Sequence, residues 1–180
     1  MYGAPIKHCK SCGTAVEHRL PDDGDTKVRA VCPACTTVHY VNPLNVVGTI
    51  PVWGDKVLLC KRNIEPRLGK WTLPAGFMEM GETTADGAAR ETVEEAGAEF
   101  ALQALFSLVN VARVGQVHMF YRAELLSDVF NPGTETQEAL LFDEADIPWD
   151  EIAFRTVKDT LERFFADRRA GAFGFHAFDI

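Results

Sequence analysis

The chain has 180 residues, of which 47% are hydrophobic and 24% are charged, and its formal net charge is -8 at pH 7. These values are typical of a globular protein with one well-buried domain and a small additional one. No apolar run approaches the roughly 18 residues of a membrane helix, and the N-terminus lacks the apolar core of a signal peptide, so we expect a cytoplasmic protein that does not bind membranes. The acidic net charge disfavours binding to a nucleic-acid backbone, so we expect no nucleic-acid partner.

Four of the five cysteines form two pairs near the N-terminus. Two residues lie between Cys9 and Cys12, two lie between Cys32 and Cys35, and nineteen residues separate the pairs. This spacing is typical of a four-thiolate zinc site. Redox-active pairs and incidental buried cysteines are the alternatives, but no thioredoxin-like pattern surrounds either pair. We predict a zinc ribbon over residues 1–40 that binds a structural Zn²⁺ and depends on it for stability.

A larger domain is predicted over residues 41–180, and two strands begin it. Residues 46–53 and 56–62 are mostly apolar, and Gly54-Asp55 between them suits a hairpin turn. Cys60 lies inside the second run and is interpreted as a small buried residue.

A basic segment follows in this acidic protein, with Lys61, Arg62, Arg67 and Lys70 inside ten residues. A run of charge is usually a solvated face. Because guanidinium groups bind phosphate bidentately, Arg62 and Arg67 are also candidates for substrate binding, and the two readings stay open.

Residues 83–97 predict a helix. Thr83 or Thr84 can cap its start, and Gly97 can end it in the left-handed conformation. Small and apolar residues recur at helical spacing and should face a sheet: Ala85, Ala88, Ala89, Thr92, Val93 and Ala96. The carboxylates Glu91, Glu94 and Glu95 are expected on the other side.

Three carboxylates at this spacing favour a bound cation, because like charges three or four residues apart destabilise a helix by roughly 0.2–0.5 kcal/mol per pair. Mg²⁺ and Mn²⁺ prefer oxygen ligands. We predict an Mg²⁺ or Mn²⁺ site made by Glu91, Glu94, Glu95 and a main-chain carbonyl near Gly76. Arg90 is expected to brace the carboxylates, and Glu82 to orient Arg90. A solvated acidic helix face is the alternative.

The remaining chain predicts strands at residues 102–111, 116–125 and 138–142, then a helix. Five apolar residues recur at helical spacing before Gly171: Phe154, Val157, Leu161, Phe164 and Phe165. The aromatic tail at residues 173–178 should cover the ribbon, the pocket or a dimer partner.

The segment that begins at Gly76 resembles the signature of the Nudix hydrolases. The matching residues, at fixed spacing, are Gly76, Glu82, Arg90, Glu91, Glu94, Glu95 and Gly97. The resemblance implies an α/β/α sandwich with a mixed sheet, preceded here by the zinc ribbon. It implies Mg²⁺-dependent hydrolysis of a nucleoside diphosphate derivative, with metal at Glu91, Glu94, Glu95 and the Gly76 carbonyl. In similar proteins a glutamate outside the signature adds a metal contact or accepts a proton, and Glu138 is preferred here over Glu135.

The family branches suggest a substrate. A zinc ribbon before a Nudix domain resembles the NADH pyrophosphatases, but their downstream Ser-Gln-Pro-Trp-Pro-Phe-Pro array is missing, which argues against NADH. The chain looks closer to the branch that cleaves FAD and ADP-ribose, releasing AMP and the other half. NADH or another dinucleotide is the alternative substrate.

A different class of function stays open. The ribbon and the Nudix domain could form a non-catalytic module that binds nucleotide or RNA, or an RNA-cap pyrophosphatase. The complete glutamate set favours an enzyme. We further expect a homodimer to which the ribbon contributes.

Overall fold

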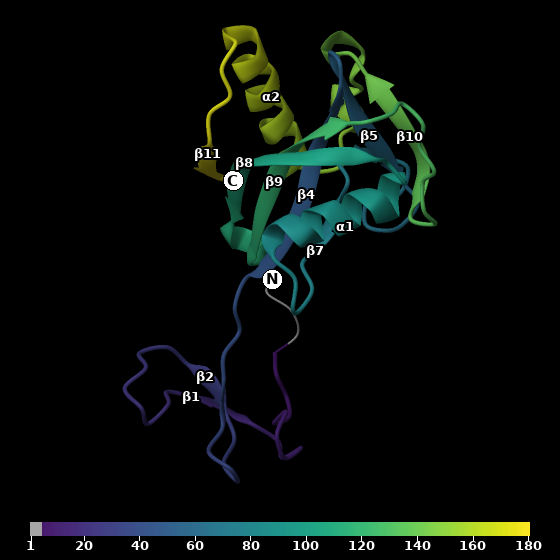
Figure 1. Cartoon of the computed structure of the whole chain (residues 1–180). Helices are drawn as coiled ribbons and strands as arrows, with labels where there is room; N and C mark the ends of the chain where they lie inside the picture. Colours follow the sequence, from purple (N-terminus) through teal and green to yellow (C-terminus); the bar gives the residue numbers. More distant parts are fainter. Residues whose placement is uncertain (1–4) are drawn as a thin grey trace. The chain divides into compact units, whose positions relative to one another are not determined.

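The structure, a computed structural model, describes residues 5–180 and divides into two compact units, whose elements are labelled in Figure 1. One unit contains the chain up to Pro43 together with Arg113–Gly115, and the other contains Leu44–Ala112 and Gln116–Ile180. Within residues 5–180, no helix has the length and apolar character needed to cross a membrane.

The smaller unit is built on an antiparallel sheet of β1 (Glu17–Arg19), β2 (Arg29–Val31) and β3 (Val38–His39), in that order. Its buried hydrophobic residues, within the described range, are Cys9, Ala30, Val31 and Cys32. A core of this size cannot stabilise a fold by burial alone, so the unit needs a further constraint.

The larger unit is organised around an eight-stranded mixed sheet. The main order is β10-β5-β4-β9-β8-β11, with β6 beside β5 and β7 beside β4. Two pairs are parallel, β4 with β9 and β8 with β11. The bounds are β4 (Leu44–Trp53), β5 (Lys56–Arg62), β6 (Trp71–Thr72), β7 (Ala75–Phe77), β8 (Phe100–Val111), β9 (Gln116–Leu125), β10 (Thr136–Phe142) and β11 (His176–Asp179). Short 3-10 helices span Ala112–Val114, Glu144–Asp146 and Trp149–Glu151.

The five predicted strands of this unit are present, and each predicted end differs from the observed one by at most two residues. The turn between β4 and β5 is the predicted Gly54-Asp55, with Gly54 at a φ of +57°. Cys60 is buried in β5, as predicted, and burial raises the pKa of its thiol.

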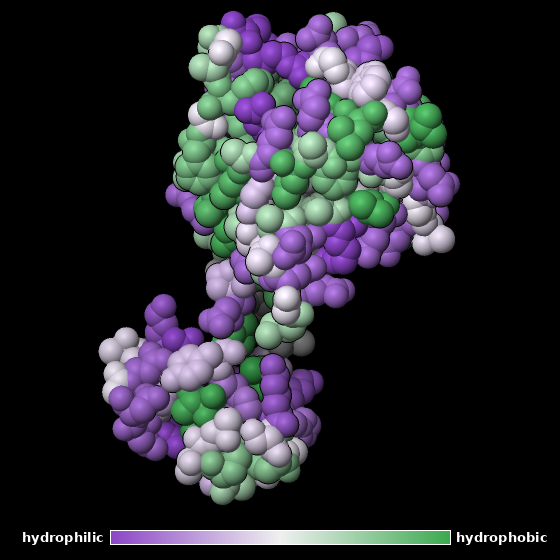
Figure 2. Space-filling model, in the orientation of Figure 1, coloured by the Kyte–Doolittle hydropathy of each residue, from purple (hydrophilic) through white to green (hydrophobic). Residues whose placement is uncertain are grey.

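Helix α1 (Thr84–Ala96) has the predicted ends. Thr83 caps it, because its hydroxyl accepts a hydrogen bond from the Asp86 N–H while the Asp86 carboxylate accepts one from the Thr83 N–H. Gly97 ends it at a φ of +58°, donating to the Val93 carbonyl. Figure 2 shows both hydrophilic and hydrophobic residues in the part of the larger unit where Figure 1 draws α1.

The buried face of α1 is rotated from the predicted stripe. Val93, predicted to face the sheet, is 55% exposed, whereas Glu95, predicted on the outer side, is only 8% exposed. Thr92 is fully buried and its hydroxyl lies 2.7 Å from that of Thr49 on β4. The rotation has a polar cause, because the backbone N–H of Ala75 donates to Glu95 Oε2 at 3.0 Å.

Helix α2 (Arg155–Ala170) packs on the other face of the sheet. Its residues Val157, Leu161, Phe164 and Phe165 join one buried cluster with Ile50, Val52 and Phe106. Successive residues of a strand point to opposite faces, so Thr49 contacts α1 and Ile50 contacts the α2 layer. The predicted α/β/α arrangement with a mixed sheet is confirmed.

The aromatic tail has a role that the sequence did not predict. It forms β11, which extends the sheet by pairing in parallel with β8, and Phe173 stacks on Phe164 of α2 with 5.3 Å between ring centroids. The ring of Phe106 and that of His176 are 4.9 Å apart. The tail therefore completes the larger unit's own sheet.

Candidate active site and metal centre

A cavity of about 780 Å³ opens in the larger unit. Helix α1 and the segment around β7 supply Gly76, Arg90, Glu91, Glu94 and Glu95 to its lining. Strands β4, β7 and β9 supply Val46, Phe77, Gln116, His118 and Phe120. The end of β5, the loops and the beginning of α2 supply Arg62, Ile64, Gly133, Glu135, Phe154 and Thr156. The sequence motif thus forms only one part of the cavity.

The three predicted carboxylates differ in their surroundings. The side chain of Glu91 is 12% exposed and that of Glu94 is 58% exposed, while Glu95 is buried. A Cβ at position 76 would lie 2.4 Å from the carboxylate of Glu91, so a larger residue there would push that carboxylate aside. The backbone of Gly76 therefore lies directly against Glu91, which fits its predicted role as a neighbouring oxygen ligand.

Arg90 links these groups, as predicted. Its Nε and Nη2 donate to the two carboxylate oxygens of Glu82, at 3.0 and 2.9 Å. Its Nη1 donates to Glu91 Oε1 at 2.8 Å and to Glu94 Oε2 at 3.1 Å. Hydrogen bonds from Arg90, and then from the backbone N–H of Glu79, lower the pKa of Glu82 to about 2. One guanidinium thus fixes the direction of three carboxylates.

The two inner carboxylates are electrostatically costly without a cation. Burial, with added repulsion from Glu91 and Glu135, raises the pKa of Glu95 to about 7 despite the hydrogen bond from Ala75. Burial is also the main cause that raises the pKa of Glu91. Several carboxylate oxygens and a close main-chain segment make a hard-oxygen donor set, which suits Mg²⁺ or Mn²⁺.

The two candidate glutamates outside α1 lie in different places. Glu135 lines the cavity, and its charge adds to the raised pKa values of Glu91 and Glu95. Glu138 does not line it and forms an ion pair with Lys61 at 2.8 Å. The geometry therefore disfavours the preference for Glu138. Glu135 precedes β10 in the loop that lines the cavity, whereas Glu138 lies within β10, directly opposite Lys61 of β5.

The two candidate arginines differ in their position relative to the cavity. Arg62 lines the cavity, is 8% exposed and donates through Nε to the carbonyl of Pro66. Arg67 is exposed, does not line the cavity, and has a positive φ of 71°. Of the predicted pair, the geometry retains Arg62.

One wall of the cavity is formed by adjacent strands, and sequence reasoning named none of its residues. Phe77, Val46 and His118 are directly paired across β7, β4 and β9, so their side chains share one face of the sheet. His118 Nε2 lies 2.9 Å from Gln116 Oε1, and burial lowers the pKa of His118 to about 4. The wall is therefore uncharged at pH 7. The polar residues at alternate positions of β9 were the available signal.

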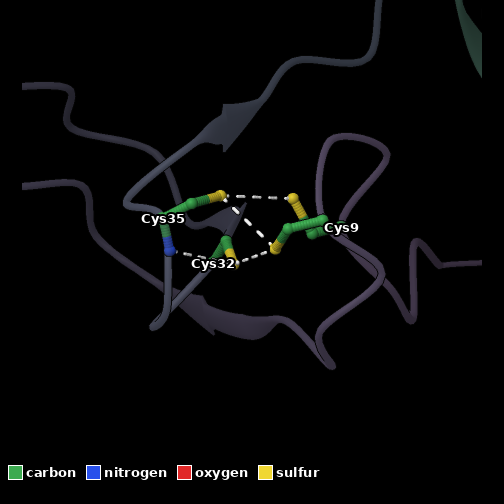
Figure 3. Close-up of side chains that lie close together, drawn as sticks. Cys9, Cys32 and Cys35 are labelled. Atoms are coloured by element: carbon green, nitrogen blue, oxygen red, sulfur yellow. Dashed lines mark hydrogen bonds between the residues drawn. The ribbon is translucent and has the colours of Figure 1, made fainter.

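The four N-terminal cysteines converge in the smaller unit, as Figure 3 shows with Cys9, Cys32 and Cys35 labelled. All four sulfurs lie within 4.8 Å of one another, and Cys9 and Cys35 are 3.6 Å apart. Four thiolates at about 2.3 Å from one zinc would be roughly 3.8 Å apart, so the arrangement fits a tetrahedral ion.

The two cysteine pairs have the same local backbone. In each, the residue four positions after the first cysteine donates to that cysteine's carbonyl and has a positive φ, 76° at Gly13 and 59° at Thr36. The N–H of Ser11 and that of Cys35 point to the sulfurs of Cys9 and Cys32. Such N–H donors stabilise thiolates, which is the form that binds metal.

A helix of clustered glutamates beside a glycine segment, on an α/β/α sandwich with a mixed sheet, defines the class of Nudix hydrolases. The family model described as "NUDIX domain" matches residues 43–165, and the chain belongs to this family of enzymes. A zinc-ribbon family described as "Nudix N-terminal" matches residues 7–41.

Individual relatives differ in what their names state. A NUDIX hydrolase structure from Nitrosomonas europaea is 50% identical, with a TM-score of 0.93, covering 97% of this chain and 99% of that one. An ADP-ribose pyrophosphatase from Methanocaldococcus jannaschii is 28% identical over 67% of this chain and 74% of its own length. The NAD-capped RNA hydrolase NudC of Vibrio atlanticus is 27% identical over 79% of this chain. The present chain spans about half of that relative, 51% of its length.

Proposed function

We propose that this protein hydrolyses the diphosphate bond of a nucleoside diphosphate derivative, with ADP-ribose or FAD as the favoured substrate. The observation that carries the proposal is the convergence of Glu91, Glu94 and Glu95 with Gly76 and Arg62 in one cavity. AMP and the other half of the substrate would be the products.

The carboxylates of Glu91, Glu94 and Glu95, with the carbonyl of Gly76, would hold Mg²⁺ or Mn²⁺. Bound divalent cations neutralise phosphate charge and lower the pKa of water. Arg90 keeps the carboxylates oriented, through the contacts described above. We assign zinc to the four cysteines as a structural ion.

Two further residues act on the substrate and on water. The buried guanidinium of Arg62 donates to a phosphate oxygen, since its Nε is already used by Pro66 and its terminal nitrogens remain. Glu135 accepts the proton of the attacking water at a carboxylate oxygen, because it lines the cavity, which Glu138 does not, and lies close enough to Glu91 and Glu95 to affect their pKa values.

The uncharged wall supports a nucleoside as part of the substrate. Phe77, Val46 and Phe120 offer apolar surface, while Gln116 and His118 offer neutral hydrogen-bonding groups. This combination suits a flat, uncharged heterocycle better than it suits a further phosphate.

Hydrolysis of NADH or NAD-capped RNA is the second candidate. It is favoured by the similarity to NudC proteins and by the N-terminal ribbon. Against it stand the acidic net charge of -8, which weakens RNA binding, and the absence from the sequence of the array described above. A homodimer and a cytoplasmic location remain predictions of the sequence.

The test is a Mg²⁺-dependent hydrolysis assay on FAD, ADP-ribose, NADH and NAD-capped RNA, with AMP release measured by chromatography. We expect turnover of ADP-ribose or FAD and a loss of about 100-fold or more in Glu95→Gln. A binding module instead of an enzyme would bind these compounds without releasing AMP.

A matched pair tests the proton acceptor. Glu135→Gln should lower kcat by about 10²-fold or more, whereas Glu138→Gln, which removes an exposed partner of Lys61, should leave kcat within about twofold. The reverse pattern would restore Glu138 as the catalytic residue.

A further inference from the structure

The beginning of α2 brings a buried polar group to the cavity that the proposed function does not use. Thr156, the second residue of α2, lines the cavity and is 3% exposed. Its hydroxyl has no hydrogen-bond partner within residues 5–180. A buried hydroxyl without a partner is destabilising, so such a group in a folded protein calls for a ligand.

The same helix end lacks the usual cap. Phe154 occupies the capping position, makes no side-chain hydrogen bond to the helix, and no acidic residue lies in the first turn. The first N–H groups of a helix have no acceptor one turn earlier and carry partial positive charge. An uncapped helix start that lines a cavity therefore favours an anion there.

A cation lies beside this helix end. The guanidinium carbon of Arg62 is 5.2 Å from the centre of the Phe154 ring, so Arg62 stacks on the capping residue. Arg62 is buried, and among the residues described it has no carboxylate within ion-pair distance. Its charge partly offsets the raised pKa of Glu95, and its terminal nitrogens can still donate to a bound group.

We infer that Thr156, Arg62 and the N-terminus of α2 together bind a phosphoryl group of the substrate, with Thr156 as a direct hydrogen-bond donor. The guanidinium of Arg62 and the N–H groups of the helix end only donate, and the Thr156 hydroxyl can donate as well, so an acceptor-only anion can accept from every group in this set. The inference rests on the proposed function, because the phosphoryl group is that of the diphosphate substrate.

Three variants separate a binding role from a packing role. Thr156→Val removes the hydroxyl at nearly constant volume, and Thr156→Ser retains it. Thr160→Val is the matched control, because Thr160 lies one turn further along α2, is fully buried, and has its hydroxyl 3.2 Å from that of Ser107. Stability, steady-state kinetics and the Kd of α,β-methylene-ADP-ribose with Mg²⁺ are measured for each variant and for the wild type.

We expect Thr156→Val to bind the methylene analogue about 10-fold to 100-fold more weakly while its melting temperature stays level or rises. Thr156→Ser should restore most of the affinity. Thr160→Val should show the opposite pattern. Its stability should be lower, because Ser107 loses its hydrogen-bond partner, and its affinity for the analogue should be unchanged.

The outcomes distinguish the two proposals. If wild type binds the analogue but releases no AMP from ADP-ribose or FAD, and Thr156→Val still weakens binding, the phosphoryl site stands and the proposed hydrolysis fails. If wild type turns over a substrate and Thr156→Val has unchanged Kd and KM, the hydrolysis stands and the phosphoryl site is refuted. No binding of the analogue by wild type refutes the site as well.

Discussion

Arg90 holds an unusual concentration of contacts for one side chain. It reaches three carboxylates and the carbonyl of Phe77, while its side chain is only 24% exposed. Its two bonds to Glu82 need the fork of a guanidinium, which lysine cannot reproduce. A substitution by lysine can therefore keep the positive charge at position 90 and remove the guanidinium geometry.

Arg90→Lys keeps the charge and loses the bidentate geometry. We expect metal affinity to fall by about 10-fold to 100-fold, because the carboxylates of Glu91 and Glu94 lose their common anchor. The Mn²⁺ affinity of each variant is measured by isothermal titration calorimetry. Arg155→Lys is the control, since Arg155 is exposed and pairs with Asp159 away from the cavity. Equal Mn²⁺ affinity in the two variants would contradict an anchoring role.

His118 makes stability depend on pH. Burial lowers its pKa from 6.5 to about 4, so the unfolded chain binds more protons than the folded one between these values. The free energy of unfolding should therefore fall as the pH drops from about 6.5 to about 4. In His118→Asn this decrease should be smaller, as measured by urea denaturation across that range.

His18→Asn serves as the control for this measurement, because His18 is exposed in the smaller unit. Other titrating groups are common to all three proteins, so only the difference from wild type is compared. A pH dependence in His118→Asn that equals that of wild type would show that His118 is not held neutral by burial.

At the scale of elements, the loop between β9 and β10 is fastened to the end of α1. The N–H of Asn131 donates to the Ala96 carbonyl, and a Cβ on Gly133 would overlap the carbonyl oxygen of Glu94. On its other side the N–H of Asn63 donates to the carbonyl of Glu135. These contacts set the position of Glu135 relative to the carboxylates of α1.

Gly133→Ala should displace this loop, because the added methyl group meets backbone and not a flexible side chain. We expect the free energy of unfolding to fall by about 1–3 kcal/mol, and we expect kcat to fall by a larger factor than the factor by which KM changes. Gly174→Ala is the matched control, since its Cβ would meet nothing closer than Asp167 at 3.8 Å. Unchanged kcat in Gly133→Ala would mean that the loop position does not matter for the reaction.

The sequence predicted the elements well because their signals are local. Each of these signals lies within a short stretch of sequence: the helix caps at Thr83 and Gly97, the alternation in the strands, and the signature residues around Glu91. The face of α1 was predicted correctly at Ala88, Thr92 and Ala96 and wrongly at Val93 and Glu95, because the pattern of apolar residues does not contain the tertiary bond from Ala75 that draws Glu95 inward.

Features that depend on distant pairing were not predictable in the same way. The bulge in β10 between Thr136 and Glu138 appears only in its register with β5. The parallel pairing of β11 with β8 and the row of Phe77, Val46 and His118 also join segments far apart in sequence. No local pattern encodes these neighbours.

At the scale of the whole molecule, the two units differ in what stabilises them. The larger unit has an extensive buried cluster between its sheet and α2. The smaller one buries few hydrophobic residues and carries the four-cysteine cluster. We therefore expect their stabilities to respond differently to loss of metal.

Removal of zinc by a chelator at neutral pH should unfold the smaller unit and leave the larger unit's thermal transition within a few degrees. Metal analysis should give one zinc per chain, and Cys32→Ser should lose it. Ser11→Ala keeps all four thiolates and should retain it. Simultaneous loss of both transitions, or a zinc-free protein that melts as before, would contradict this expectation.

The two faces of β4 also bear on how such a protein can change. Val47 and Thr49 face the helix that carries the carboxylates, whereas Val46, on the alternate face, lines the cavity beside His118. Substitutions on the cavity face can alter which compound is accepted while the hydrolytic groups keep their support. A mutant library confined to Val46, Gln116 and His118 should therefore yield altered substrate preferences at a high frequency of active clones, and natural drift at these positions can diversify the enzyme without passing through inactive forms.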